Sequence, residues 1–268
     1  MKSFLRWLRR PLERARQAPV RRALEQQLSE HFKDTVQLVS AQTKGGYDEI
    51  YYAKRGQQRF AVVRVNSPHK QQNDPIGPLD PGVPLGAQER LEREWDAYQK
   101  LAPHQLSPQP IWRGDNAIAC SWIDWERASR VLIQNRAQFW PLMEQIIPAI
   151  RAMHDADVIH LDLNLGNMLV APNGKEIAII DFEFGPVDWV SIPQQRAYDY
   201  LRIVDNCIKK RRGGKLLLKE PERLVRLLNE NVDQATREAS MAFSLEKLHL
   251  LAEQKSLLSL LRRVFPNL

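Results

Sequence analysis

The sequence predicts an α+β protein of two parts, a small antiparallel β-sheet part followed by a mostly helical part. Short runs rich in β-branched and aromatic residues, separated by turn residues, occupy residues 36–65 and 110–123. After residue 125, apolar residues recur at helical spacing over long stretches. The chain has 268 residues, 43% of them hydrophobic and 26% charged. A chain of this size and composition can bury a substantial core.

Composition narrows the cellular setting and the classes of partner. Two cysteines, Cys120 and Cys207, provide no disulfide framework and favour a reducing compartment. No apolar run has the length of a membrane span, and residues 1–10 lack the apolar core of a signal peptide. We therefore expect a cytoplasmic protein. The net charge of +7 indicates an anionic partner such as a nucleotide, a phosphorylated sugar or a lipid head group. Without zinc-finger spacing or an aromatic RNA-binding motif, we do not expect a nucleic-acid partner.

Residues 1–30 are predicted to form a basic, helical N-terminal extension. Phe4, Trp7 and Leu8 lie among several arginines, with further arginines up to residue 22. Two interpretations stay open. Residues 1–22 could lie at the surface of an anionic membrane, possessing both the apolar and the basic side chains that this requires. Alternatively, the segment packs on the domain with its basic face in solvent.

The first part contains three predicted strands between Val36 and Val65. Gly45 and Gly46 lie between the first two strands, where a glycine pair lets backbone approach a phosphate closely, although by itself the pair is better explained by an ordinary hairpin. Arg64 lies on the third strand and Lys54 on the second. Residues 66–88 are rich in proline and glycine, which excludes regular structure and is typical of a functional or disordered loop.

Several helices are predicted from periodicity. Residues 87–101 place Leu91, Trp95, Tyr98 and Leu101 on one face. Residues 136–154 are predicted to form a helix whose apolar residues recur on one buried face, and Pro148 is expected to kink it. Residues 196–204 are helical, and a basic loop follows at 209–214. Two leucine-rich helices close the chain at about 220–232 and 244–264, the second capped by Ser244.

The central stretch contains the candidate chemistry. Asp162 and Asn167 precede an apolar run, an Asn173-Gly174 turn and a second apolar run that ends at Asp181. Asn-Gly between apolar runs predicts a hairpin, which would bring the three side chains together. Their oxygens are hard ligands suited to Mg²⁺ held jointly with phosphate, and one carboxylate left off the metal could accept a proton from a hydroxyl. A surface hairpin with chance Asp and Asn residues is the alternative.

The pattern His160-x-Asp162-x-x-x-x-Asn167, followed by Asp181-Phe182, resembles the catalytic loop and metal-binding motif of the protein-kinase-like superfamily. The resemblance implies a two-lobed protein-kinase-like fold with ATP and Mg²⁺ as cofactors. Its N-lobe, a small antiparallel β-sheet with one helix, would be residues 31–124, and a mostly helical C-lobe would follow at 125–268. Asp162 and Asn167 would be catalytic, and Asn167 and Asp181 would hold the metal. His160 would brace the loop.

The resemblance also assigns nucleotide-binding residues in the N-lobe. Gly45 and Gly46 would cover the phosphates. The third-strand position that usually holds Lys is Arg64, which keeps the charge but has a planar fork, and Lys54 is an alternative donor. Glu94 would pair with Arg64, with Glu92 as the second choice.

Departures from the pattern indicate the type of kinase. Leu161 and Asn164 replace the Arg and Lys of protein kinases, Glu183 replaces the Gly of the third motif, and no Ala-Pro-Glu segment follows. The loop instead resembles bacterial lipopolysaccharide core kinases of the Kdo and heptose type, and Asp-Phe-Glu is similar to aminoglycoside and choline phosphotransferases. This implies an ATP-dependent phosphotransferase that acts on a hydroxyl of a lipopolysaccharide core sugar or related small molecule. The alternatives are an atypical serine/threonine protein kinase and a non-catalytic pseudokinase scaffold.

Overall fold

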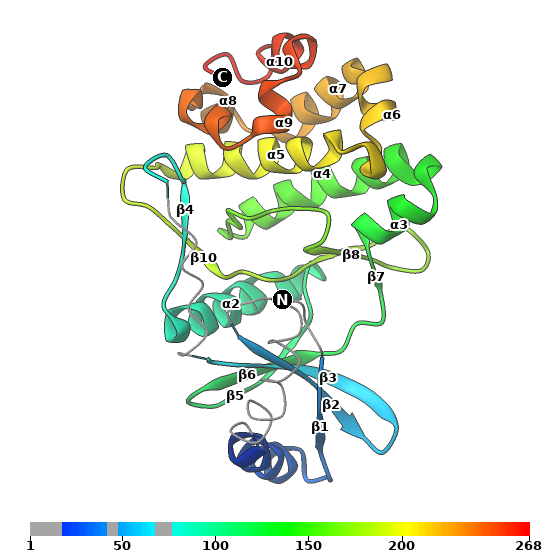
Figure 1. Ribbon diagram of the computed structural model, residues 1–268, viewed down its shortest axis with the longest axis vertical. Helices are drawn as coiled ribbons and strands as arrows, with labels where there is room; N and C mark the ends of the chain where they lie inside the picture. The colour runs from blue at the N-terminus through cyan, green and yellow to red at the C-terminus, as the bar shows by residue number, and fades with distance from the viewer. Residues whose placement is uncertain (1–17, 42–47, 68–76) are drawn as a thin grey trace, which may run out of the picture. The chain divides into compact units, whose positions relative to one another are not determined.

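The computed structural model describes residues 18–41, 48–67 and 77–268 (Figure 1). Gly45, Gly46 and most of the predicted basic extension lie outside these ranges. The chain divides into two compact units, one formed by residues up to 70 together with Ile111–Trp122, the other by residues 71–110 and Ile123–Leu268. The first unit contains a β-sheet and the second is mostly helical, which confirms the predicted α+β fold class.

The first unit is built on a five-stranded sheet with the order β1-β2-β3-β6-β5. Its strands are β1 (Gln37–Ser40), β2 (Glu49–Arg55), β3 (Gln58–Val65), β5 (Pro110–Arg113) and β6 (Ala117–Ser121). Strands β2 and β3 are antiparallel, with Ala53 opposite Ala61. Gly56 lies in the turn between them at a φ of 56°, a left-handed value that glycine adopts without strain.

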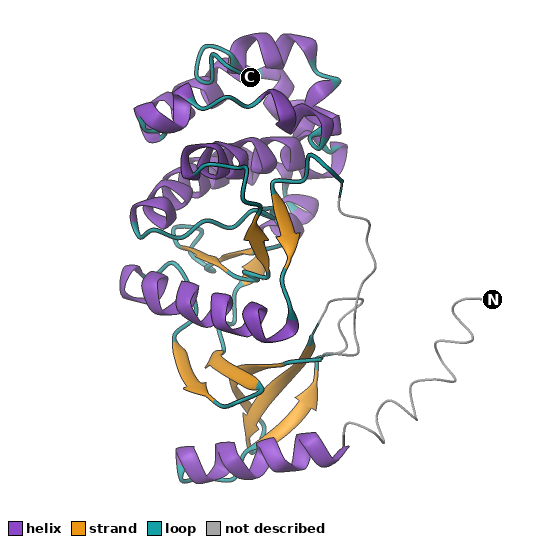
Figure 2. Cartoon of the chain, turned by 90° about the vertical axis from the view of Figure 1, so that its left-hand side faces the viewer, coloured by secondary structure: helices purple, strands orange, loops and turns teal. Residues whose placement is uncertain are grey.

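A helix over residues 18–32 covers one face of this sheet (Figure 2). Its apolar residues Leu24 and Leu28 are buried against Ala53, Ala61 and Val63 of the central strands. Because side chains alternate along a strand, the neighbouring residues project from the opposite face. That opposite face carries half-buried side chains: Ile50, Tyr52, Lys54, Val62 and Arg64.

The second unit contains α2 (Ala87–Leu101), α3 (Ala128–Gln134), α4 (Phe139–Asp155), α5 (Ile192–Ile208), α6 (Gly214–Lys219), α7 (Pro221–Asn231), α8 (Gln234–Glu238), α9 (His249–Ala252) and α10 (Lys255–Leu261). Short 3₁₀ helices connect some of these: η1 (Ala102–His104), η2 (Arg136–Gln138), η3 (Lys210–Arg212) and η4 (Ala242–Glu246). The predicted apolar face of the 136–154 helix is buried in α4. Pro148 lies inside α4, which continues on both sides of it.

Two small sheets accompany these helices. Strands β7 (Glu126–Arg127), β8 (Met168–Val170) and β9 (Ile177–Ile179) form one, in that order. The β8–β9 pair is the hairpin predicted from Asn173-Gly174, and Gly174 has a φ of 70° in its turn. Strands β4 (Gly82–Pro84) and β10 (Phe184–Pro186) form the other. Part of the Pro-rich 66–88 loop therefore adds a strand to the segment that follows Asp181, where the sequence predicted no regular structure.

The C-terminal region departs from prediction in one respect. The expected helix over 244–264 is divided into η4, α9 and α10. Ser244 is not a cap, because it is buried and its hydroxyl donates a 2.7 Å hydrogen bond to the carbonyl oxygen of Met241, within a 3₁₀ turn. Among the described residues, no helix is both long and apolar enough to cross a membrane.

Candidate active site

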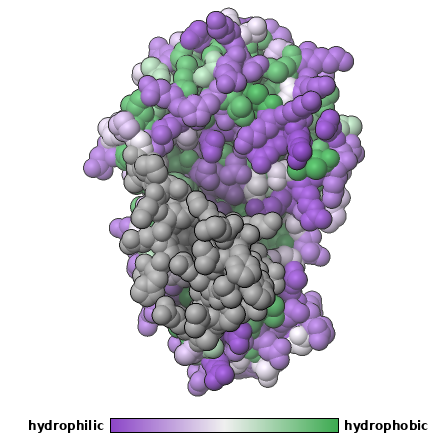
Figure 3. Space-filling model, in the orientation of Figure 1, coloured by the Kyte–Doolittle hydropathy of each residue, from purple (hydrophilic) through white to green (hydrophobic). Residues whose placement is uncertain are grey.

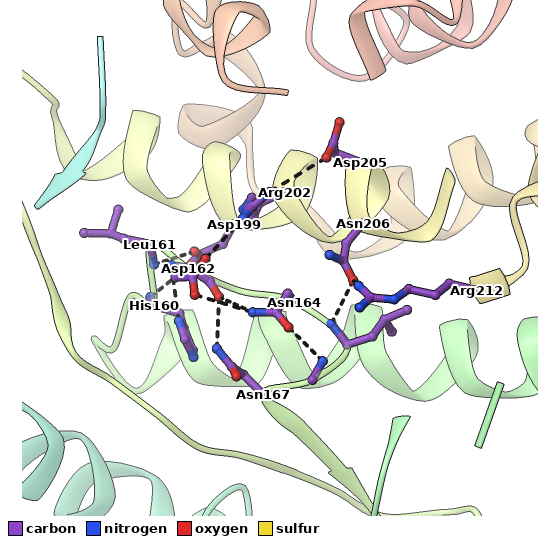
Figure 4. Close-up of polar contacts among 12 residues, drawn as sticks. His160, Leu161, Asp162, Asn164, Asn167, Asp199, Arg202, Asp205, Asn206 and Arg212 are labelled. Carbon is purple, nitrogen blue, oxygen red and sulfur yellow. Dashed lines mark hydrogen bonds and ion pairs between the residues drawn. The ribbon is translucent and has the colours of Figure 1, made fainter. Parts of the chain in front are cut away.

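Residues 160–167 form an irregular loop between α4 and β8, and helix α5 anchors its start (Figure 4). The carboxylate of Asp199, fully buried on α5, accepts hydrogen bonds from the backbone N–H groups of His160 (2.9 Å) and Leu161 (2.8 Å). The Nε2 atom of His154 lies 3.1 Å from the same carboxylate. One buried acid therefore satisfies two backbone N–H groups at the start of an irregular loop.

Asp199 also stabilises an uncommon backbone conformation. Leu161 has a φ of 66°, in the left-handed region that costs a non-glycine residue on the order of 1 kcal/mol or more. Its side chain is 4% exposed and lies beside Gly82 of β4. The hydrogen-bonded amide and the buried side chain of Leu161 hold this conformation. The side chain of the next residue, Asp162, is partly exposed.

His160 links the 160–167 loop to the segment before Asp181. Its ring is fully buried, with Nε2 3.0 Å from the carbonyl oxygen of Ile180 and Nδ1 3.3 Å from the amide nitrogen of Asp162. A carbonyl can only accept and an amide can only donate, so these partners assign a neutral ring protonated at Nε2. The ring also contacts Phe182, with centroids 4.7 Å apart. These contacts agree with the predicted bracing role.

The carboxylate of Asp162 has two polar neighbours. Nη2 of Arg202 lies 3.2 Å from its Oδ1, and Nδ2 of Asn164 lies 3.5 Å from its Oδ2. The same Asn164 amide donates a 3.0 Å hydrogen bond to the Asp162 carbonyl oxygen. Because the side chains of Asp162 and Arg202 are 32% and 28% exposed, the carboxylate is oriented yet remains accessible to an incoming hydroxyl.

Asn167 connects the two predicted acids. Its Nδ2 donates a 3.2 Å hydrogen bond to the carbonyl oxygen of Asp162, and its own carbonyl accepts a 3.0 Å bond from the amide of Ile180. Asn167 thus links the backbone of Asp162 to that of Ile180, the residue before Asp181. Asp181 follows Ile180 directly and has a φ of 78°, a second left-handed non-glycine residue in this region. Such strained positions are concentrated at functional sites.

The oxygens of Asn167 and Asp181 suit a magnesium ion. Because Nδ2 of Asn167 donates to a carbonyl, which can only accept, the amide orientation is settled and Oδ1 is the atom left for a cation. Asp181 adds carboxylate oxygens on the adjacent segment. Amide and carboxylate oxygens are the kinds of ligand with which few protein groups hold Mg²⁺ together with substrate phosphates.

The local electrostatics around Arg202 favour a permanent positive charge beside Asp162. Burial opposes the charged guanidinium, but Tyr198, Asp162 and Asp205 outweigh it and raise the pKa of Arg202 above its usual value. Burial also raises the pKa of Tyr198 to about 12, so this phenol stays neutral near pH 7 and does not act as a base. Of the two carboxylates beside Arg202, that of Asp162 is 32% exposed and that of Asp205 is 6% exposed, so the Asp162 carboxylate is the accessible one.

The far end of the loop is held by the same helix. Oδ1 of Asn206 accepts a 3.2 Å hydrogen bond from the amide of Leu165 and another from the guanidinium of Arg212. Asp199, Arg202 and Asn206 recur at intervals of three and four residues, so one stripe of α5 positions the whole loop. Sequence reasoning assigned no role to these residues: Asp199 and Arg202 lie within the predicted 196–204 helix, and Asn206 lies beyond its predicted end.

In the sheet unit, Arg64 has a partner that the sequence did not predict. Its Nη1 lies 3.4 Å from Oδ2 of Asp48, a buried acid just before β2. In the helical unit, Glu94 is buried and accepts a hydrogen bond from the hydroxyl of Tyr98. Glu92 is exposed and accepts a 3.1 Å hydrogen bond from the side chain of Gln88, one turn earlier. Arg64 and Glu94 belong to different units, and their pairing stays a prediction.

The match to a family model agrees with the superfamily indicated by the loop. A RIO domain, which belongs to the protein-kinase-like superfamily, matches residues 86–205, a little under half of the chain. No curated protein matches the sequence significantly. Among solved structures, an ethanolamine kinase from Plasmodium vivax is similar, with 14% sequence identity and a TM-score of 0.47; the match covers 84% of this chain and 76% of that one.

Proposed function

We propose that this member of the protein-kinase-like superfamily transfers the γ-phosphate of ATP to a hydroxyl group of a lipopolysaccharide core sugar or a related small molecule. The observation that carries the proposal is the arrangement around Asn167, whose side chain is bonded to Asp162 and whose backbone is bonded to the residue before Asp181. Phosphoryl transfer needs a proton acceptor, a metal-binding pair and nearby positive charge held in fixed positions.

Asp162 is assigned as the general base. Its carboxylate orients the acceptor hydroxyl and takes its proton as the oxygen attacks the γ-phosphorus. Asn164, where protein kinases have Lys, uses its amide to hold the Asp162 backbone. Arg202 lies 3.2 Å from Asp162 and is assigned the positive charge that stabilises the phosphoryl group during transfer.

Asn167 and Asp181 are assigned as the residues that hold Mg²⁺ on the nucleotide. Bound Mg²⁺ would neutralise phosphate charge and orient the γ-phosphate. Arg64 is assigned to the nucleotide phosphates, with Gly45 and Gly46 covering them and Glu94 as its partner. The half-buried apolar side chains on the same sheet face, Ile50, Tyr52 and Val62, are suited to contact the base.

The segment after Asp181 does not favour a protein kinase that is regulated by phosphorylation of a loop. Only residues 182–191 separate Asp181 from α5, and part of this segment is fixed as β10 against β4. This leaves no long loop to be ordered by phosphorylation, the usual switch of regulated protein kinases. The basic residues 1–22 are proposed to bring the protein to an anionic membrane, where lipid-linked sugars are confined.

The test is Mg²⁺-dependent ATP consumption by the purified protein with core oligosaccharides that contain Kdo or heptose, with small amino alcohols and with a generic protein substrate. We expect turnover with a sugar or small acceptor, and a phosphorylated product by mass spectrometry, both abolished in Asp162→Asn. Turnover with the protein substrate alone would favour an atypical serine/threonine kinase. Absence of turnover with every acceptor would favour a pseudokinase scaffold, the alternative motivated by Arg64.

A further inference from the structure

A cluster of exposed cations lies beyond the end of α5, separate from the candidate catalytic residues. Its five members are Lys209, Lys210, Arg211, Lys215 and Lys219, hereafter the 209–219 basic patch. No Asp or Glu occurs in residues 206–219. Among the described residues, none of the five forms a salt bridge, whereas nearby Arg223 pairs with Glu144 and Glu220. The patch therefore gathers five exposed cations within eleven residues, none of them in a salt bridge with a described carboxylate.

The backbone of the 209–219 basic patch is held in place by two glycines. Gly213 has a φ of 100°, and a side chain there would collide with the ring of Phe139. A side chain at Gly214 would lie 1.9 Å from the carbonyl oxygen of Ile208. The chain must fold back tightly at this point, so η3 and α6 present their cations from a fixed turn.

Two exposed aliphatic side chains accompany the cations. Leu218 is 43% exposed and shares a face of α6 with Lys215, three residues earlier. Ile133 is 57% exposed on α3, the helix that packs beside η3. Figure 3 shows a largely hydrophilic surface on the face that it draws, with separate hydrophobic areas. Leu218 and Ile133 are two of only a few large apolar side chains this exposed among the described residues.

We infer that the 209–219 basic patch docks on an anionic lipid bilayer. Clustered Lys and Arg attract anionic head groups, and each contributes about fivefold in affinity, the factor that corresponds to roughly 1 kcal/mol. Leu218 and Ile133 can enter the interfacial region between head groups. A nucleic acid fits less well, because the patch contains no aromatic side chain on which a base could stack. This surface is distinct from residues 1–22 and does not depend on the proposed catalysis.

The test is co-sedimentation of the full chain with vesicles of 70% phosphatidylcholine and 30% phosphatidylglycerol, at low and high salt. The patch variant is Lys210→Gln/Arg211→Gln/Lys215→Gln. Its matched control is Lys33→Gln/Lys175→Gln/Lys255→Gln, which removes the same charge from three exposed lysines elsewhere. We expect the patch variant to lose on the order of 10²-fold in vesicle affinity, with the control nearly unchanged at equal Tm.

A second variant, Leu218→Ser, should weaken binding without changing net charge or the salt dependence. Equal losses in the patch variant and its control would mean that net charge alone drives binding, and the inference would fail. Unchanged binding in the patch variant would assign the membrane contact to another segment. If the patch variant lost affinity for a single-stranded RNA but not for vesicles, the partner would be nucleic acid and the inference would be wrong.

Discussion

Arg202 on α5 forms an ion pair with Asp162, with 3.2 Å between Nη2 and Oδ1, and its Nη1 lies 3.8 Å from Oδ2 of Asp205. A cation is thus placed beside the proposed base by helix α5, and not by the 160–167 loop, where Asn164 stands at the position of the Lys of protein kinases. The guanidinium is partly exposed and stays protonated at any accessible pH, because its pKa is raised. It can therefore act on Asp162 and on an incoming phosphoryl group.

Replacing Arg202 by Ala is expected to lower kcat on the order of 10²-fold, the effect of removing one charge-stabilising donor from a transition state. Arg202→Lys should recover part of this loss, because it keeps the charge without the planar fork. The KM for ATP should change little, since the nucleotide-binding residues are untouched. Steady-state kinetics of both variants check this. Arg223→Ala, which removes an ion pair on α7, is the control and should leave kcat unchanged.

The proposed base and metal ligand should respond differently to the same chemical change. Asp162→Asn removes the proton acceptor, and we expect turnover to fall by roughly two to four orders of magnitude with nucleotide binding retained. Asp181→Asn should instead weaken Mg²⁺-dependent nucleotide binding, because it removes a hard oxygen ligand. Turnover assays and calorimetric titration of ATP with and without Mg²⁺ separate the two. A stably folded Asp162→Asn variant with near-normal turnover would contradict the role assigned to Asp162.

The local sequence pattern predicts the β8–β9 hairpin but not the residues that hold the 160–167 loop in place. Asn173-Gly174 between apolar runs predicts the β8–β9 pair, because the turn and both strands are adjacent in sequence. The anchors of the loop come from Asp199 and Asn206, which are distant in sequence and converge only through the packing of α5. Nothing in the residues near Asp162 encodes that convergence. The same holds for β4, whose pairing with β10 depends on a partner about a hundred residues away.

Contacts with residues distant in sequence also explain why the predicted 244–264 helix is divided into η4, α9 and α10. Its leucines have helical spacing, but Leu248 and Leu251 are buried by neighbours that the periodicity does not reveal. The amide of Leu251 donates a 2.9 Å hydrogen bond to Oδ1 of Asp205 on α5. An amide bonded to a side chain of another helix marks the start of α9, so tertiary contacts outweigh local propensity there.

A further prediction asks which strand supplies the cation that contacts the nucleotide phosphates, β3 through Arg64 or β2 through Lys54. Arg64→Ala is expected to raise the KM for ATP, and Arg64→Lys should restore part of the affinity if this side chain contacts phosphate. Asp48→Asn should have a smaller effect in the same direction, because Asp48 orients Arg64 at 3.4 Å. Nucleotide titrations of the three variants and of Lys54→Ala provide the comparison. If Lys54→Ala abolishes binding while Arg64→Ala does not, the phosphate contact belongs to β2.

The last prediction concerns stability at low pH and is independent of catalysis. Asp233 caps α8, accepting a 3.0 Å hydrogen bond from the amide of Thr236 and a 2.7 Å bond from its hydroxyl. Burial tends to raise the pKa of this carboxyl, but the Thr236 hydrogen bonds and two arginines outweigh it, so the pKa is lowered. A carboxyl with a lowered pKa stabilises the folded state above its unfolded pKa of about 3.9, and this contribution is lost as pH falls through the folded value.

Asp233→Ala should therefore reduce the free energy of unfolding by about 1 kcal/mol at pH 7, the usual cost of losing a helix N-cap. Asp233→Asn keeps a capping oxygen but removes the charge, so its loss of unfolding free energy relative to wild type should be smaller than that of Asp233→Ala. This loss should be fully present at pH 6 and should diminish below about pH 4, where the wild-type carboxyl becomes protonated. Urea denaturation of both variants at pH 6, 4 and 3 measures these differences. A deficit of Asp233→Asn that stayed constant across this range would show that the ionised carboxyl contributes nothing beyond the cap itself.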